Sequence, residues 1–146
     1  MPQKNERGAM AVEFALITPI LLLLVVGIIE FGILLVNQAM LTNASREAAR
    51  AGIVASNPRP SGTGTGSITS VVNAYLTNAG LNVGSATVTV QNLTTAATCG
   101  ATPCCTTFQD DLSVRVIYAY SFVALPSLIA GFSTPTLGAT TRMKCE

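Results

Sequence analysis

An uninterrupted apolar run from Phe14 to Val36 constrains this chain more than any other feature. Glu30 is its only charged residue, and as an α-helix the run would measure about 34 Å, enough to cross a hydrocarbon core of about 30 Å. A cleaved secretory signal has a shorter apolar stretch, about 7–15 residues, followed by a small-residue cleavage site, and neither fits this sequence. The run therefore predicts one retained membrane-spanning helix.

Composition narrows the possible classes of function. Only 10% of the 146 residues are charged, the net charge is +1, and the chain has no histidine. Without a basic run interleaved with aromatic residues nucleic-acid binding has little support, and without histidine a Ser/His/Asp set is impossible. The adjacent acids Asp110 and Asp111 are expected in a solvated turn. We therefore expect a non-enzymatic protein with no cofactor, no metal, no nucleic-acid partner and no small-molecule substrate.

Four segments are expected along the chain. Residues 1–8 form a polar leader, and a transmembrane and stalk helix follows over residues 9–55, of which the part at about 14–36 is apolar enough for lipid. Residues 56–66 have the Gly-, Pro- and Ser-rich composition of a linker. No Lys-Ser/Thr pair follows these glycines, so a phosphate-binding loop is not expected. Residues 67–146 are expected to form an extracytoplasmic domain.

This outer domain is expected to begin with a helix. From Ile68 onward, apolar residues recur at i, i+3, i+4, i+7, i+8 and i+11, which predicts a helix of about four turns. Ser67 is a suitable N-cap, and Gly80 is suited to the C-terminal end.

After this helix the apolar period shifts towards two. The alternation predicts strands over residues 86–91, 113–120 and 137–143. Residues 121–135 are too short and too interrupted by Pro and Gly for a second span, and are expected to cover the sheet or contact the bilayer. The fold class is therefore α+β: the long N-terminal helix plus a small domain of one short helix and a roughly three-stranded antiparallel sheet.

The four cysteines, Cys99, Cys104, Cys105 and Cys145, all lie in the second half of the chain. Beyond a membrane anchor, disulfides are the favoured use. A zinc site of four thiolates is the alternative, although the adjacent pair departs from the usual C-x2-C spacing. If the last two strands pair antiparallel, Cys104 or Cys105 approaches Cys145, and Cys99 closes a small loop with the other. Of the three possible pairings, we favour Cys99–Cys104 with Cys105–Cys145.

The junction between leader and helix carries the most informative motif. Arg7-Gly8-Ala9 is followed by Glu13, a single carboxylate at the start of the apolar helix. This arrangement resembles the class III signal of type IV pilin-like proteins, which implies that a membrane-embedded prepilin peptidase cuts between Gly8 and Ala9. The resemblance also implies that Glu13 pairs with the new N-terminus of a neighbouring subunit, since a carboxylate at the edge of hydrocarbon is costly without a partner. The alternative is that Glu13 only favours the positive end of the helix dipole.

A narrower resemblance covers roughly residues 7–52. Its matching sequences are VEFAL at 12–16, Pro19, EFG at 30–32 and REAARAG at 46–52. They resemble TadE-like proteins, minor pseudopilins of tight-adherence (Flp-type, type IVb-like) pilus systems. The resemblance implies a pilin-like structural subunit that supports assembly or secretion of the pilus. It further implies the membrane, a prepilin peptidase, other pilin-like subunits and the assembly platform as partners.

Two further residues of the span are candidates for a specific role. Pro19 is expected to kink the helix or to loosen one backbone hydrogen bond, since its ring cannot donate a hydrogen bond and crowds the preceding turn. Glu30 lies ~25 Å beyond Glu13 along the helix axis, near the far interface of the membrane. An acid within a span indicates a functional contact, here with a partner helix or with the assembly platform. Solvation at the headgroup level is the alternative.

The flanking charges and the motifs predict one topology. Lys4 and Arg7 favour a cytoplasmic N-terminus, although Arg46 and Arg50 lie beyond the span. We expect a single-pass protein of the inner (cytoplasmic) membrane whose C-terminal domain is extracytoplasmic, either incorporated in a pilus or retained in the membrane. The alternative function is a membrane-anchored envelope protein with a binding domain unrelated to pili, which would keep residues 1–8.

Overall fold

The computed structural model of the protein describes residues 4–54, 59–122 and 134–146. The chain divides into two compact units, Met1–Leu34 with Phe122–Ser133 and Leu35–Ser121 with Thr134–Glu146. Most of the segment 121–135, which was expected to cover the sheet or contact the bilayer, lies outside the described residues.

Helix α1, Lys4–Ile53, is the longest element and contributes to both units. It begins before the expected Ala9, because the residues preceding Gly8 are good helix formers and a single glycine is tolerated. It continues without interruption through Pro19. Its end at Ile53 comes shortly before Asn57-Pro58, a pair that disfavours helical backbone. The long N-terminal helix expected from the apolar run is confirmed.

The short helix is also confirmed, as α2, Ile68–Asn78. Its N-cap is Ser67, whose hydroxyl accepts a hydrogen bond from the Ser70 backbone N–H at 3.2 Å. At the other end Ala79 is the C-cap, and Gly80 follows it with a φ of +76°. That left-handed conformation lets the Leu81 N–H reach the Leu76 carbonyl at 2.9 Å, which satisfies a terminal carbonyl of the helix.

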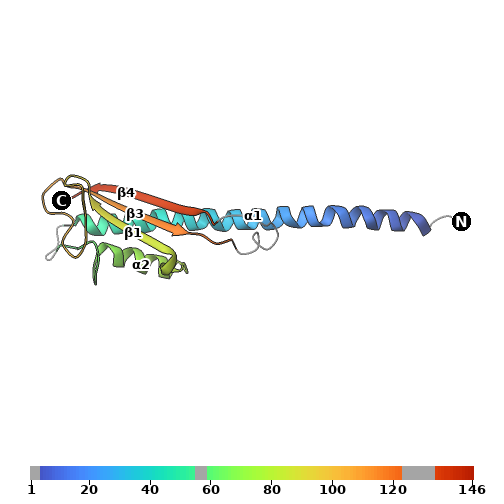
Figure 1. The fold of residues 1–146 in the computed structure, drawn as a ribbon, viewed down its shortest axis with the longest axis horizontal. Helices are drawn as coiled ribbons and strands as arrows, with labels where there is room; N and C mark the ends of the chain where they lie inside the picture. Colours follow the sequence, from blue (N-terminus) through green and yellow to red (C-terminus); the bar gives the residue numbers. More distant parts are fainter. Residues whose placement is uncertain (1–3, 55–58, 123–133) are drawn as a thin grey trace. The chain divides into compact units, whose positions relative to one another are not determined.

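The sheet is antiparallel throughout, in the order β2-β1-β3-β4, and Figure 1 shows β1, β3 and β4 side by side. The three expected strands are β1 (Ala86–Asn92), β3 (Asp111–Ala119) and β4 (Thr136–Lys144). A 3-10 turn, η1 (Val83–Ser85), leads into β1. A fourth strand, β2 (Ala97–Thr98), adds two residues beside the end of β1. A strand of two residues is too short to show an alternation of apolar and polar side chains, so the sequence predicts only three strands.

One face of this sheet packs against the two helices of the second unit, as Figure 1 shows for α2 and the C-terminal half of α1. A Cβ atom added at Gly52 of α1 would lie 2.6 Å from Leu112 Cδ2 on β3 and 2.7 Å from Ile68 Cδ1 on α2. The glycine therefore permits the close approach of all three elements. The fully buried side chains of this core include Leu41, Ala44, Ala48, Ile68, Val72, Leu76, Val114 and Val116.

Polar contacts fix the position of α1 along β4. The Gln38 side-chain amide donates to the Gly138 carbonyl at 2.8 Å. The hydroxyls of Ser45 and Thr141 lie 2.8 Å apart, and Ser45 is fully buried. Because buried polar groups must be paired, these contacts set the register between helix and strand. The second half of α1 is therefore part of the domain core.

Candidate functional site

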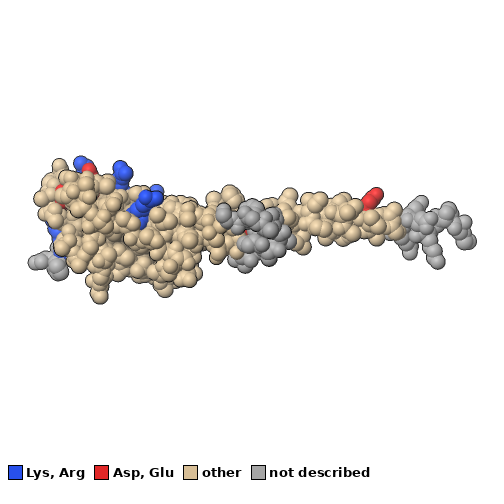
Figure 2. Space-filling view, in the orientation of Figure 1, with Lys and Arg blue, Asp and Glu red and all other residues tan. Residues whose placement is uncertain are grey.

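The first candidate site is the exposed apolar surface of α1. Large apolar side chains along residues 10–36 are mostly exposed to solvent, among them Phe14 (71%) and Ile20 (71%). Figure 2 shows this stretch of helix almost free of charged side chains. Its most apolar window has a mean hydropathy of 2.8 with only 6% of the window buried. Such a surface favours cover by an apolar medium, and the helix is long and apolar enough to cross a membrane.

The predicted processing site lies at the N-terminal end of this helix. α1 is already helical at Gly8 and Ala9, so the peptide bond expected to be cut is within the helix rather than before it. No heavy atom lies within 4 Å of a Cβ atom added at Gly8. Glu13 is exposed on the same helix, five residues further on. Glu13 and Gly8 are therefore both accessible to a protein partner at this end.

Pro19 lies inside α1, next to a threonine whose side chain hydrogen-bonds the preceding turn. The ring removes one backbone donor and crowds the preceding turn. In that turn the Thr18 hydroxyl donates to the Phe14 carbonyl at 2.7 Å. This bond supports the turn that the proline weakens, and the helix continues past it.

Glu30 differs from Glu13 in its environment. Its side chain is only 3% exposed, whereas its neighbours Ile29 and Phe31 are 57% and 60% exposed. A buried carboxyl group in an apolar segment must be compensated, and Glu30 has such an interaction within the chain.

At the other end of α1, in the second unit, the C-terminus is fastened to the helix. Cys105 is bonded to Cys145 and Cys99 to Cys104, with Cα–Cα distances of 5.7 and 5.3 Å, which is the pairing favoured from the sequence. The Glu146 N–H donates to the Ile53 carbonyl at 3.2 Å. The Cys105–Cys145 disulfide joins the segment after β4 to the loop before β3, and the Glu146–Ile53 hydrogen bond joins the same segment to the end of α1.

Arg59 reinforces this fastening. Its guanidinium donates from Nη1 to the Cys105 carbonyl and from Nη2 to the Glu146 carbonyl, both at 3.1 Å. The expected linker is thus partly ordered: the Thr63 N–H donates to the Gly100 carbonyl at 3.0 Å, and Ser61 bridges to Pro103. Gly62 lies so close to the Cys99 carbonyl that a Cβ atom would clash with that backbone.

The Asp110 carboxylate is buried and hydrogen-bonded. The expectation that Asp110 lies in a solvated turn was therefore wrong. It is 2% exposed, and its carboxylate accepts hydrogen bonds from the backbone N–H and hydroxyl of both Thr106 and Thr107 and from the Asn92 side-chain amide, at 2.7–3.2 Å. These bonds, above all those from Thr107, hold the pKa of Asp110 well below its usual value near 3.8. The same Asn92 amide donates to the Cys104 carbonyl at 2.9 Å.

This pKa shift predicts how the domain responds to acid. Because the folded pKa of Asp110 lies below the unfolded value, its stabilising contribution is complete above about pH 5 and is lost as the pH falls towards the folded pKa. We expect Asp110→Asn to lower the melting temperature at pH 7 and to flatten the acid dependence below about pH 4. Near-UV circular dichroism of the tyrosines, all of which lie in the second unit, measures this melting. The control is Asp111→Asn at the partly exposed neighbour; an equal effect of both variants would contradict the assignment.

The described residues offer little to a metal ion. Within residues 4–54, 59–122 and 134–146 there is no group of three or more His, Cys, Asp or Glu side chains that could hold one. The four cysteines are all in disulfides. The alternative, a zinc site of four thiolates, is therefore not formed in this structure, because no cysteine is free.

These features define a class: an α+β protein with one N-terminal helix long and apolar enough to cross a membrane and with a disulfide-bonded sheet domain. Residues 8–50 match the model of a family described as TadE-like protein. The match confirms the resemblance seen in the sequence motifs and ends before α2. This family is structural and associated with tight-adherence pili. No curated protein and no solved structure matches the chain.

Proposed function

We propose that this protein is a pilin-like structural subunit, a minor pseudopilin that supports assembly or secretion of a tight-adherence (Flp-type) pilus. One observation carries the proposal: an exposed apolar helix with an exposed carboxylate, Glu13, at its N-terminal end, in the segment that matches the TadE-like family. An apolar surface of this kind is covered by lipid before assembly and by other apolar helices after it.

Each segment has a distinct role in this proposal. Residues 1–8 are a cytoplasmic leader that a prepilin peptidase removes, and the first half of residues 9–55 is the membrane anchor. Residues 56–66 connect α1 to residues 67–146, which form the domain outside the cytoplasm together with the second half of α1. The disulfides support this orientation, because disulfides persist in oxidising compartments.

Glu13 acts in this proposal through charge pairing. Cleavage after Gly8 creates a positively charged α-amino group on Ala9, one helical turn before Glu13. When a neighbouring helix packs alongside, its α-amino group can neutralise Glu13 in a region where an unpaired carboxylate is costly. The pair then fixes the axial register between two subunits. Glu30, further along the helix, is proposed to contact a partner helix or the assembly platform.

Substitution of the glycine before the cut tests this function. We expect Gly8→Val to keep residues 1–8 attached and to reduce the yield of pili to background, because a branched side chain obstructs the peptidase. Since a Cβ atom at Gly8 meets nothing within 4 Å, folding gives no reason for a loss. Pili sheared from cells and the mass of the extracted protein are the two measurements.

The control is Gly100→Val, at a glycine outside the proposed assembly helix whose added Cβ atom also meets nothing within 4 Å. It should be processed and should assemble like the unaltered protein. If Gly8→Val assembles normally while its leader is retained, the proposed processing step has no role in assembly. In an envelope protein unrelated to pili, neither substitution would change the yield of pili or the processing of the N-terminus.

A further inference from the structure

β4 is an edge strand: within the described residues it is hydrogen-bonded to a strand on one side only, to β3 (Figure 1). In an antiparallel pair, residues whose backbone groups bond the neighbouring strand alternate with residues whose groups point away from it. The Tyr120 N–H donates to the Pro135 carbonyl at 3.0 Å, and the Cys145 N–H donates to the Asp110 carbonyl at 2.8 Å. The odd-numbered residues of β4 therefore direct their backbone groups to β3, and the even-numbered residues direct theirs to the open edge.

The second half of this edge is free. The Gly138 carbonyl, which points outward, accepts a hydrogen bond from the Gln38 side chain at 2.8 Å. Further along the strand Thr140, Arg142 and Lys144 are exposed, and in the described part of the chain nothing bonds their outward backbone groups. A row of unpaired backbone donors and acceptors at a sheet edge can accept a strand from another polypeptide.

The side chains along this edge are positively charged. Arg142 and Lys144 lie on the face of the sheet away from the helices, as does Arg115 of β3, which is paired with Thr140. Within the described residues none of these three cations has an ion pair. Asp111, opposite Lys144, is the only acid that the strands place on this face. Figure 2 shows Lys and Arg side chains gathered on the second unit with few acidic ones between them.

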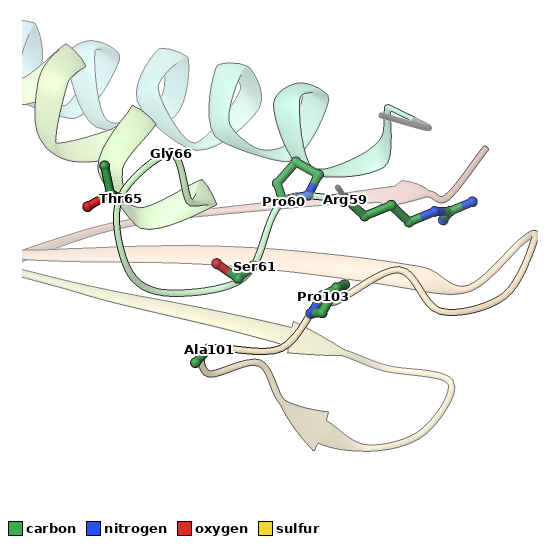
Figure 3. A pocket seen from close by; sticks show the side chains of 7 residues that line it. All are labelled: Arg59, Pro60, Ser61, Thr65, Gly66, Ala101 and Pro103. Atoms are coloured by element: carbon green, nitrogen blue, oxygen red, sulfur yellow. The ribbon is translucent and has the colours of Figure 1, made fainter. Parts of the chain in front are cut away.

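Arg59, by contrast, is already bound within the domain. Its guanidinium donates to the carbonyls of Cys105 and Glu146, both at 3.1 Å. Figure 3 shows it directed away from the rest of the hollow between Pro60 and Pro103. This hollow therefore offers no free guanidinium to an anionic partner, whereas the β4 edge offers two free cations beside a free backbone.

The charges decide which strand can pair with β4. A second copy of β4 would bring two more cations and no acid, because residues 136–144 contain none. Like charges opposite one another across a strand pair are destabilising, and opposite charges are stabilising. An acidic strand places a carboxylate beside Arg142 and another beside Lys144. The two cations therefore oppose pairing of β4 with itself and select an acidic partner.

We propose that the open edge of β4 binds an extended acidic segment of another protein as an additional antiparallel strand. The outward backbone groups of Thr140, Arg142 and Lys144 provide the hydrogen bonds, and the side chains of Arg142 and Lys144 select alternating carboxylates. The edge lies outside residues 8–50, so this binding does not rest on the leader, on Glu13 or on the proposed function.

A synthetic peptide tests the edge on the full-length protein in detergent. The probe is a fluorescent peptide of alternating valine and glutamate, and its binding is measured by fluorescence anisotropy. We expect saturable binding of this peptide and none of a valine–lysine peptide of equal length. Methylation of the glutamate backbone nitrogens should abolish binding, because those amides can no longer donate. No binding of the acidic peptide, equal binding of the lysine peptide, or unchanged binding after methylation would overturn the proposal.

Two charge reversals separate binding at the edge from binding across the face of the sheet. Arg142→Glu should weaken binding of the acidic peptide by about tenfold, because a like charge then stands opposite a carboxylate. Arg115→Glu makes the same change one strand further from the edge, where solvent and salt screen it, and should weaken binding by less than about threefold. An equal loss in both variants would show that the peptide lies across the face, which contradicts the proposal.

A proline at the edge tests the backbone contribution. Thr140→Pro removes an outward N–H that β3 does not use, and proline is tolerated on edge strands. We expect the variant to fold, as tyrosine circular dichroism would show, and to lose binding of the peptide. A folded Thr140→Pro protein that binds normally would overturn the proposal. So would a dimer of the peptide-free protein that Thr140→Pro disrupts, because a second copy would then occupy the edge.

Discussion

Replacing Glu13 by alanine is expected to leave the protein in the membrane and to reduce pilus assembly to background. Insertion should survive because removing a carboxylate makes the span more apolar, and acidic residues oppose insertion by up to roughly 3 kcal/mol at the centre of a span. Assembly should fail because the α-amino group of the neighbouring subunit then has no partner, and the axial register is no longer specified. Carbonate-resistant membrane association and the yield of sheared pili measure the two effects separately.

Two further substitutions at this position distinguish charge pairing from a simple helix-end effect. Glu13→Asp keeps the charge and should retain part of the assembly, whereas Glu13→Gln keeps the size without the charge and should fail like alanine. A carboxylate that only favours the helix N-terminus contributes about 0.3–1 kcal/mol, too little to abolish assembly. Normal pilus yield in Glu13→Ala would therefore reduce Glu13 to that lesser role.

Removing the Cys105–Cys145 disulfide is expected to have the largest effect on the stability of the outer domain. Its partners are 40 residues apart, and a loop of that length corresponds to about 4 kcal/mol of stabilisation. In a domain of this size the double variant Cys105→Ala with Cys145→Ala should melt roughly 15–25 °C lower. The bond also brings β4 to the end of α1, where the Cys105 sulfur lies 3.4 Å from the Gly52 carbonyl.

The second disulfide is the matched control. Cys99 and Cys104 are only five residues apart, so their bond should contribute about 2 kcal/mol. We expect Cys99→Ala with Cys104→Ala to lower the melting temperature by about half as much. Melting of the detergent-solubilised full-length protein, followed by tyrosine circular dichroism, gives both values. A larger loss from the Cys99–Cys104 variant would contradict the proposed fastening of the C-terminus to α1.

The elements that follow a simple period could be predicted from the sequence. The apolar run predicted α1, the helical spacing after Ser67 predicted α2, and the alternation around Val114 and Val116 predicted β3. Antiparallel pairing of the last two strands brought Cys104 or Cys105 towards Cys145, and in the structure the bonded residue is Cys105. In each case one local physical rule was sufficient.

Features that depend on three-dimensional neighbours could not be predicted in this way. Asp110 was assigned to a solvated turn because the sequence does not show that the fold brings Asn92, Thr106 and Thr107 around its carboxylate. The Thr107-x-x-Asp110 spacing, in which a hydroxyl three residues away can bind a carboxylate, was the local signal available. Gly62 seemed part of a flexible linker, but its closeness to Cys99 becomes visible only when the two loops meet.

The intact mass of the protein extracted from its native membrane tests the central proposal most directly. A pilin-like subunit should lack residues 1–8 and begin at Ala9 in cells that contain the prepilin peptidase, and it should retain those residues in cells that lack it. N-terminal sequencing of the same sample identifies the first residue independently. A mature chain that still begins at Met1 in the presence of the peptidase would contradict the account.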